Sequence, residues 1–129
     1  MDVFGSADRL ASWVGICPGN NESAGKRKSG HLHKGNLYVR RLLCEFAHAA
    51  RRTQSVFKSK FQALVIRRGY KRAIIAIGHK ILRTIYFMLK RGQHYRDSAT
   101  DYEALSVQRH APRWIKALTK FGFIQPAST

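Results

Sequence analysis

The sequence predicts an all-α protein, a compact bundle of about four helices followed by a partly helical C-terminal tail. Three observations indicate this class. Apolar residues recur at helical spacing in several segments, residue types that cap or end helices flank those segments, and no segment alternates apolar and polar residues as a half-buried strand does. We expect residues 1–97 to form the domain and residues 98–129 to form the tail, since 129 residues with 44% hydrophobic content suit one domain.

The first predicted helix follows Ser6, a residue type that caps helix N-termini. Leu10, Trp13 and Val14 repeat at helical spacing after it, and Gly15 is the expected end. A long basic, glycine-rich loop over residues 18–35 then separates this helix from the second one. Almost nothing in that loop is apolar, so it cannot pack into a core.

The second helix is expected to begin after Asn36 as its cap and to run to about Thr53. Its apolar stripe is made of the following residues: Val39, Leu42, Leu43, Phe46, Ala47 and Ala50. The third helix is expected over Val56–Arg68, with Gly69 as its stop.

The fourth helix, from about Lys71 to Arg91 and ended by Gly92, has the longest apolar stripe. In the tail we expect a short helix over Pro112–Phe121, because proline is favoured in the first turn. The core residues predicted from these stripes are Trp13, Leu42, Leu43, Phe46, Phe57, Phe61, Ile74, Ile77, Ile81 and Ile85.

The charge balance points to a polyanionic partner. The chain has 24 Lys and Arg residues against 7 Asp and Glu, a formal net charge of +17. Thirteen Lys and Arg residues lie between Glu45 and Asp97 with no acidic residue among them. Such self-repulsion favours nucleic acid as the partner, and an anionic membrane surface or a ribosome is the alternative.

The two cysteines and the apolar content indicate a cytoplasmic location without a membrane span. No apolar run approaches the roughly 18 residues that a spanning helix needs, and the first residues do not resemble a secretory signal. We therefore expect Cys17 and Cys44 to be reduced and buried.

Most catalytic or metal-binding patterns are not found in the sequence. The zinc-capable residues are Cys17, His31, His33, Cys44 and His48, and their long, irregular spacing predicts no metal site. Seven scattered carboxylates do not suggest a two-metal nuclease. The segment Gly25–Gly30 is not a nucleotide-binding phosphate loop, but its glycines and cations suit the DNA backbone.

Ser23 is the hydroxyl that stands where the cationic part of the loop begins. A serine is a poor nucleophile unless one group activates it and another stabilises the charge that it creates. Nearby cations could stabilise an attacked phosphodiester. From the residues alone, however, an ordinary polar loop serine is the more common interpretation.

The same loop and its surroundings resemble the C-terminal domain of the insertion-sequence 110/116/902 transposases. The matching runs are Leu10–Trp13, Gly15–Gly30, Lys34–Asn36, Arg40–Leu42, Arg68–Ala73, His79, Met88–Lys90, Tyr95–Asp97 and Asp101–Tyr102. The segment Pro-Gly-Asn-Asn-Glu-Ser-x-Gly, residues 18–25, is the most specific of these.

This resemblance implies a recombinase that moves a DNA element. The family serine maps onto Ser23, with Ser29 as the alternative, and it attacks DNA to form a covalent link. An N-terminal RNase H-like domain of the family holds magnesium in an acidic tetrad, so we expect no cofactor in this chain. DNA, a bridging RNA and further copies of the intact enzyme are the implied partners. The residues expected to bind nucleic acid are Lys26, Arg27, Lys28, Lys34, Arg40, Arg41 and Arg72.

The acidic-tetrad domain has no counterpart in this sequence, so we expect a C-terminal fragment that does not catalyse transposition alone. The alternative is a basic nucleic-acid-binding protein that derives from a transposase remnant and carries out no chemistry.

Overall fold

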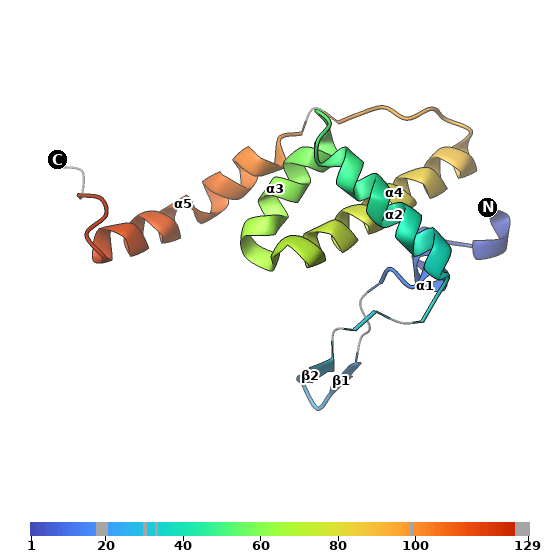
Figure 1. The fold of residues 1–129 in the computed structure, drawn as a ribbon, viewed down its shortest axis with the longest axis horizontal. Coiled ribbons are helices and arrows are strands. Elements are labelled where there is room, and N and C mark those ends of the chain that lie inside the picture. Colours follow the sequence, from blue (N-terminus) through green and yellow to red (C-terminus); the bar gives the residue numbers. More distant parts are fainter. Residues whose placement is uncertain (18–20, 30, 33, 99, 126–129) are drawn as a thin grey trace.

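The computed structural model describes residues 1–17, 21–29, 31–32, 34–98 and 100–125, and for residues 21–23 and 27–29 it describes the backbone alone. The elements follow the order η1 (Asp2–Phe4), α1 (Ala7–Val14), β1 (Asn21–Ser23), β2 (Lys26–Ser29), α2 (Leu37–Ala50), α3 (Val56–Arg68), α4 (Tyr70–Arg91) and α5 (Tyr102–Lys120). The predicted helical class is therefore confirmed (Figure 1). The departure is a short β-hairpin inside the predicted loop.

Helix α4 is the centre of the bundle, and α1, α2 and α3 all pack against it. Two apolar clusters lie at different levels along α4. The first joins α1 and the start of α2 to the second half of α4, and its buried residues are Ala7, Leu10, Ala11, Val14, Ile16, Leu43, Leu82 and Tyr86. The second joins the end of α2 and α3 to the first half of α4, through Ala47, Phe61, Ala73, Ile74 and Ile77. Helices α2 and α4 therefore run antiparallel.

The crossing of α2 and α4 is close because Gly78 is at the contact. A Cβ added at Gly78 would lie 3.0 Å from Cδ1 of Ile16 and 3.3 Å from the carbonyl oxygen of Leu43. At such distances a neighbour must give by a few tenths of an ångström, so glycine at position 78 lets α2 lie this near to α4 without that displacement. Ile16, fully buried, fills the remaining space between the helices.

The predicted helix caps of α1 and α2 are confirmed. The Ser6 hydroxyl accepts a hydrogen bond from the backbone N–H of Arg9 at 3.2 Å, and the Asn36 side chain accepts one from Val39 at 3.1 Å. Helices α1, α3 and α4 end at Gly15, Gly69 and Gly92, as expected. Helix α2 ends at Ala50, three residues before the predicted Thr53.

The predicted core is correct in part. Leu43, Phe61, Ile74 and Ile77 are buried, and Phe57 and Ile81 pack against the clusters. The prediction was wrong for three residues that are about half exposed: Trp13, Leu42 and Phe46. Helix α2 is rotated so that Leu43 and Ala47 face α4, which turns the neighbouring residues toward solvent.

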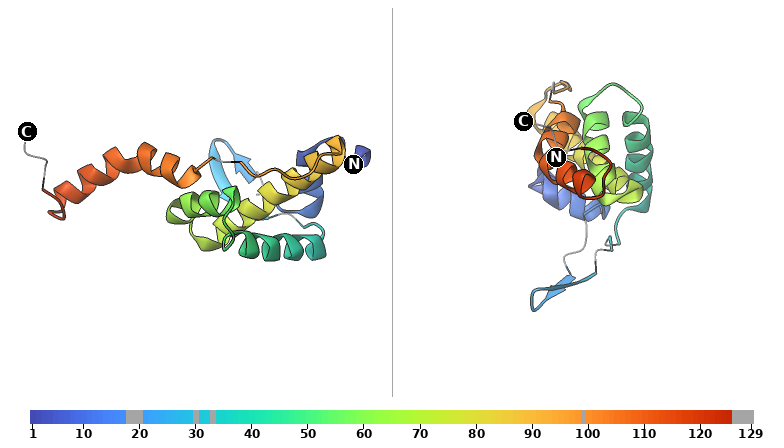
Figure 2. Two further views of the ribbon diagram at one scale, coloured as in Figure 1. Left: turned by 90° about the horizontal axis from the view of Figure 1, so that it is seen from above. Right: turned by 90° about the vertical axis from the view of Figure 1, so that its left-hand side faces the viewer.

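The tail helix was also predicted wrongly at its N-terminus. Helix α5 begins at Tyr102, and Pro112 lies inside it. The Asp101 carboxylate caps it by accepting hydrogen bonds from the N–H groups of Glu103 and Ala104 at 3.0 and 3.1 Å. Because this cap starts the helix ten residues earlier, the proline sits in its interior, where it leaves one backbone hydrogen bond unmade. Figures 1 and 2 show α5 leaving the bundle.

Candidate nucleic-acid interface

The loop between α1 and α2 leaves and rejoins the bundle at one place. A Cβ atom added at Gly35 would clash with the carbonyl oxygen of Val14 and would lie 2.5 Å from the backbone nitrogen of Gly15. The returning chain therefore contacts the end of α1 directly. The N–H of Asn36 donates to the carbonyl oxygen of Trp13 at 3.3 Å. The Arg40 guanidinium donates to the carbonyl oxygen of Gly15 at 3.2 Å. These contacts close the base of the loop.

Beyond this base the chain forms the hairpin of β1 and β2, which projects from the bundle on the side of α1 (Figures 1 and 2). The pairing is antiparallel, with Ser23 opposite Lys26. The two residues between them, Ala24 and Gly25, both have positive φ, 52° and 73°. Two consecutive left-handed residues make the turn type whose twist matches paired strands.

The predicted nucleophile is the last residue of β1, next to the turn. Its side chain lies outside the described part of the structure, so the catalytic role of Ser23 stays a prediction, and the same holds for Ser29 as the alternative. The side chains of Arg27 and Lys28 are also outside that part. Lys26, across from Ser23, is exposed.

The other predicted nucleic-acid contacts fall into two groups. Lys34 and Arg41 are exposed near the loop base, while Arg40 is half-buried and bonds to Gly15. Arg72 is exposed in the first turn of α4, beside the end of α2, as the hydrogen bond between Tyr70 and His48 shows. The structure therefore brings Lys34, Arg40 and Arg41 near the loop but places Arg72 at the opposite end of α2.

Ion pairing within the described residues neutralises little of the positive charge. Among side chains that the structure describes, Arg83 and Asp8 make the one ion pair, which links α4 to α1. Burial and the neighbouring Lys80 lower the pKa of Lys60. Burial and the charge of Arg83 also lower the pKa of His79.

The two cysteines are free thiols that are partly buried, less than predicted. Burial raises the pKa of Cys17, and Asp8 raises it further. Burial also raises the pKa of Cys44, against the effect of Arg40. Both side chains are therefore protonated thiols near neutral pH, a form that is a poor nucleophile.

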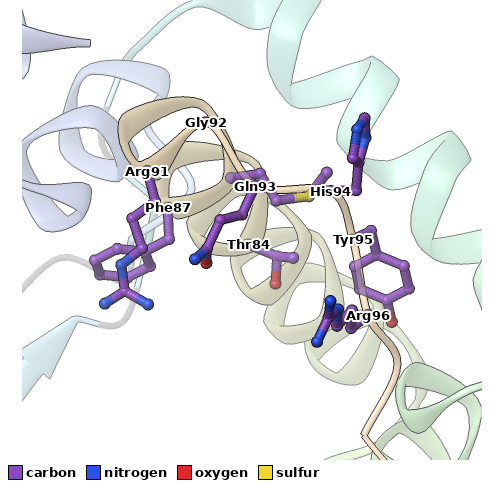
Figure 3. Close-up of a pocket in the computed structure, with 9 residues that line it drawn as sticks. Thr84, Phe87, Arg91, Gly92, Gln93, His94, Tyr95 and Arg96 are labelled. Carbon is purple, nitrogen blue, oxygen red and sulfur yellow. The ribbon is translucent and has the colours of Figure 1, made fainter.

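A second cationic surface lies where the chain turns back after α4. Its pocket is lined by Thr84, Phe87, Met88, Arg91, Gly92, Gln93, His94, Tyr95 and Arg96 (Figure 3). The Arg91 guanidinium lies 5.1 Å from the centre of the Phe87 ring, which holds this cation at the surface. The sequence predictions missed this surface, although two arginines around a helix-ending glycine were a usable signal.

The segment that follows is fixed by a carboxylate. Asp97 accepts hydrogen bonds from the N–H of Val56 at 3.2 Å and from the Tyr95 hydroxyl at 2.8 Å. The bond from Tyr95, together with those from the backbone, lowers the pKa of Asp97. Burial and this hydrogen bond raise the pKa of Tyr95 to about 12. Asp97 thereby attaches the chain between α4 and α5 to the start of α3.

Comparison with known proteins identifies the region that contains the loop. Residues 1–62 match the family described as Transposase IS116/IS110/IS902. The N-terminal half of this chain belongs to the IS116/IS110/IS902 transposase family. The matched residues of the transposase domain include α1, the hairpin and α2, and they end within α3. The resemblance recognised from the loop motif is thus confirmed.

Curated relatives extend the similarity beyond residue 62. A probable family 20 transposase of Pseudomonas aeruginosa is 29% identical over 98 residues, which cover 72% of this chain and 29% of the relative. The transposase for insertion sequence element IS1111A of Coxiella burnetii is 31% identical over 104 residues, 74% of this chain and 28% of the relative. The chain thus spans less than a third of the length of these curated relatives. No solved structure matches the chain significantly.

Proposed function

We propose that this chain is the DNA-binding, serine-bearing part of a DNA transposase and that Ser23 is its nucleophile. The observation that carries the proposal is the hairpin within the family-matched region, which holds the backbone of Ser23 beside the turn at the end of a projecting loop. The exposed Lys26 is its cross-strand neighbour. A nucleophile in this position could reach a phosphate of a duplex without contact between DNA and the bundle.

The chemistry is a transesterification at phosphorus. The Ser23 oxygen forms a bond to phosphorus, the bond from phosphorus to a strand oxygen breaks, and that oxygen leaves with a proton. The cations of the loop stabilise the charge on the attacked phosphate. A serine hydroxyl also needs help to lose its proton.

Metal ions would provide that help. Among the described residues, no group of three His, Cys, Asp or Glu side chains could hold a metal ion. We therefore place the magnesium of the reaction in a separate acidic domain, with which this chain acts. Bridging RNA and further copies of the enzyme belong to the same proposal.

A covalent adduct assay tests the role of Ser23. The chain alone should form no adduct with DNA, but with a matching acidic domain, magnesium and the RNA of the element it should form one. Ser23→Ala should abolish this adduct and leave DNA affinity nearly unchanged, because one hydroxyl contributes little beside a net charge of +17. Denaturing gels and mass mapping of the linked peptide report the outcome. Ser29→Ala is the matched control.

Each alternative result has its own interpretation. An adduct that survives Ser23→Ala but not Ser29→Ala would move the nucleophile to Ser29. An adduct formed by the isolated chain would contradict the need for a second domain. DNA binding without an adduct under any condition would favour the second candidate, a non-catalytic nucleic-acid-binding protein, which the net charge of +17 also supports.

A further inference from the structure

Helix α5 has an apolar face that the bundle does not cover. We define the α5 seam as Ala104, Val107, Ala111, Trp114 and Leu118 of the helix together with Phe121, the C-cap residue that follows it. Their spacing alternates between three and four residues, which is the seven-residue repeat of helices that pair along their length. No residue of α5 is buried, and 42% of Leu118 and 72% of Phe121 are exposed.

The contact of α5 with the bundle uses a different face. The Lys60 ammonium lies 4.7 Å from the centre of the Tyr102 ring, and the Ser59 hydroxyl bonds to Asp101 at 2.9 Å. These contacts fix the first turn of α5 on α3. Ala104 and Val107 remain exposed beside it, and so do Trp114, Leu118 and Phe121 farther along the seam, whereas Ala111 is half-buried.

The distribution of charge on α5 indicates what can cover the seam. Its cations lie on the opposite face, as Arg109, Arg113, Lys116 and Lys120. The positions that flank the seam beyond the first turn are Gln108, His110, Ile115 and Ala117, none of which is Lys or Arg. Flanking charges decide which helices can pair. Two copies of a chain with net charge +17 could therefore meet along this face without opposing cations in the contact.

The order of residue sizes indicates the direction of pairing. If two α5 helices run antiparallel about a point between residues 112 and 113, Ala111 faces Trp114, Val107 faces Leu118 and Ala104 faces Phe121. Each layer then combines a smaller residue with a larger one, as well-packed helix interfaces require. In a parallel pair Trp114 would meet Trp114 and Ala111 would meet Ala111, which leaves one layer overfilled and another empty.

We propose that α5 is a dimerisation helix that pairs antiparallel with α5 of a second copy through the α5 seam. The helix of 19 residues extends about 28 Å. Its five seam residues and the C-cap residue Phe121 give six layers of paired side chains, which the two-fold axis relates in three pairs. The contact forms outside the bundle and leaves the hairpin of each copy free.

Analytical ultracentrifugation of the full chain tests this self-association. The protein is first treated with nuclease and is then measured in about 1 M salt, where the screening length for charge repulsion is about 3 Å. Leu118→Glu should weaken dimerisation by about 100-fold, because each dimer loses two buried leucines. Leu105→Glu is the matched control, because Leu105 is in the same helix, 52% exposed, but off the seam. It should leave dimerisation unchanged. Val107→Glu should act as Leu118→Glu does.

A wild-type chain that remains monomeric, or equal effects of Leu105→Glu and Leu118→Glu, would overturn the proposal. Circular dichroism checks that each variant keeps its bundle, which buries no α5 residue. Dimerisation should strengthen with salt while DNA binding weakens. The two salt dependences are opposite, so failure of one proposal can be told from failure of the other.

Disulfide trapping tests the direction, in a background with Cys17 and Cys44 replaced by alanine. Ala104→Cys and Phe121→Cys chains should each fail to cross-link alone, since identical positions lie far apart in an antiparallel pair. A mixture of the two should form the heterodimeric disulfide. Cross-linking of each variant with itself, and none between them, would show a parallel pair and overturn the proposed arrangement.

Discussion

At the scale of single residues, Gly78 controls how closely two helices approach. A side chain there would meet Ile16 at 3.0 Å and the backbone of Leu43 at 3.3 Å. We predict that Gly78→Ala lowers the free energy of unfolding by about 1 kcal/mol, because overpacking costs about 1–3 kcal/mol and alanine returns about 1 kcal/mol of helix propensity. Urea denaturation measures this change.

Ile16→Val provides the control for Gly78→Ala, because it deletes the Cδ1 atom that the new methyl group would meet. In that background Gly78→Ala should cost less than in the wild-type chain, or even stabilise it. An equal cost in both backgrounds would show that the Leu43 backbone, rather than Ile16, resists the substitution.

Tyr95 and Asp97 give a prediction about pH. The pKa of Tyr95 is raised to about 12, first by burial and then by Asp97. A raised folded-state pKa gives stability that is complete below the ordinary value near 10 and is lost as pH rises through about 12. Ultraviolet titration, with Tyr95→Phe subtracted, should show this late ionisation. Asp97→Asn should shift it to lower pH, and an unchanged titration would refute the link.

Asp97 has the opposite pH dependence. Its pKa is lowered, mainly by the hydrogen bond from Tyr95, so the contribution to stability is present above the unfolded pKa and is lost as pH falls through the folded value. Both ionisations act on the same attachment of the chain to α3.

At the scale of elements, the turn of the hairpin contains a strained residue. Ala24 has φ of 52°, a region that costs a residue with a Cβ about 1–2 kcal/mol. Asparagine tolerates it best among non-glycine residues. We predict that Ala24→Asn increases the population of the hairpin and that Ala24→Pro abolishes it, because proline fixes φ near −65°. Cross-strand nuclear Overhauser effects between residues 23 and 26 measure the population.

The thermal unfolding of the bundle should not change in either Ala24 variant, since none of the hairpin side chains that the structure describes belongs to the two buried clusters. A large shift in unfolding temperature would mean that the hairpin packs on the helices.

Elements whose limits depend on local chemistry could be predicted from the sequence. Ser6 and Asn36 cap helices because their side chains bond to backbone three residues away, and such bonds need no tertiary information. The predicted start of α5 was wrong because two residue types each indicate a helix start: a proline such as Pro112 in the first turn and an aspartate such as Asp101 at the N-cap. The strands were missed because they are three and four polar residues long, without an apolar alternation.

Features that depend on tertiary packing could not be predicted. Positions 42 and 43 are both leucine and both belong to the predicted apolar stripe. Only the rotation of α2 against α4 determines that Leu43 is buried and that Leu42 is 55% exposed. For the candidate site, the sequence located the loop and its exposed Lys26. It did not show that Arg40 bonds to Gly15 or that Arg72 lies at the far end of α2.

At the scale of the whole molecule, charge should dominate binding. Each neutralised phosphate adds about −0.9 to the slope of log K against log salt, so about five contacts should reduce affinity steeply between low and moderate salt. Replacing Lys26, Arg27 and Lys28 together with alanine should flatten this slope. Fluorescence anisotropy with labelled duplex DNA measures it.

The control variant replaces Arg67, Arg68 and Lys71 with alanine. It removes as many positive charges as the loop variant does, but near the junction of α3 and α4, where all three residues are exposed. If the loop is the interface, this variant should keep a steeper slope than the loop variant. Equal slopes would show that binding depends on net charge and not on the loop.

In the part of the chain that the structure describes, none of the helices has the length and the apolar character that a membrane-spanning helix needs.

The closed base of the loop has a consequence for how such a domain can change over time. Because Gly35 and Asn36 return to the backbone of residues 13–15, the ends of the excursion stay together whatever lies between them. The free-energy cost of closing a loop grows only slowly with its length. Substitutions and insertions beyond the base can therefore accumulate with little effect on the helices, so the projecting segment can vary in sequence and length while the scaffold stays the same.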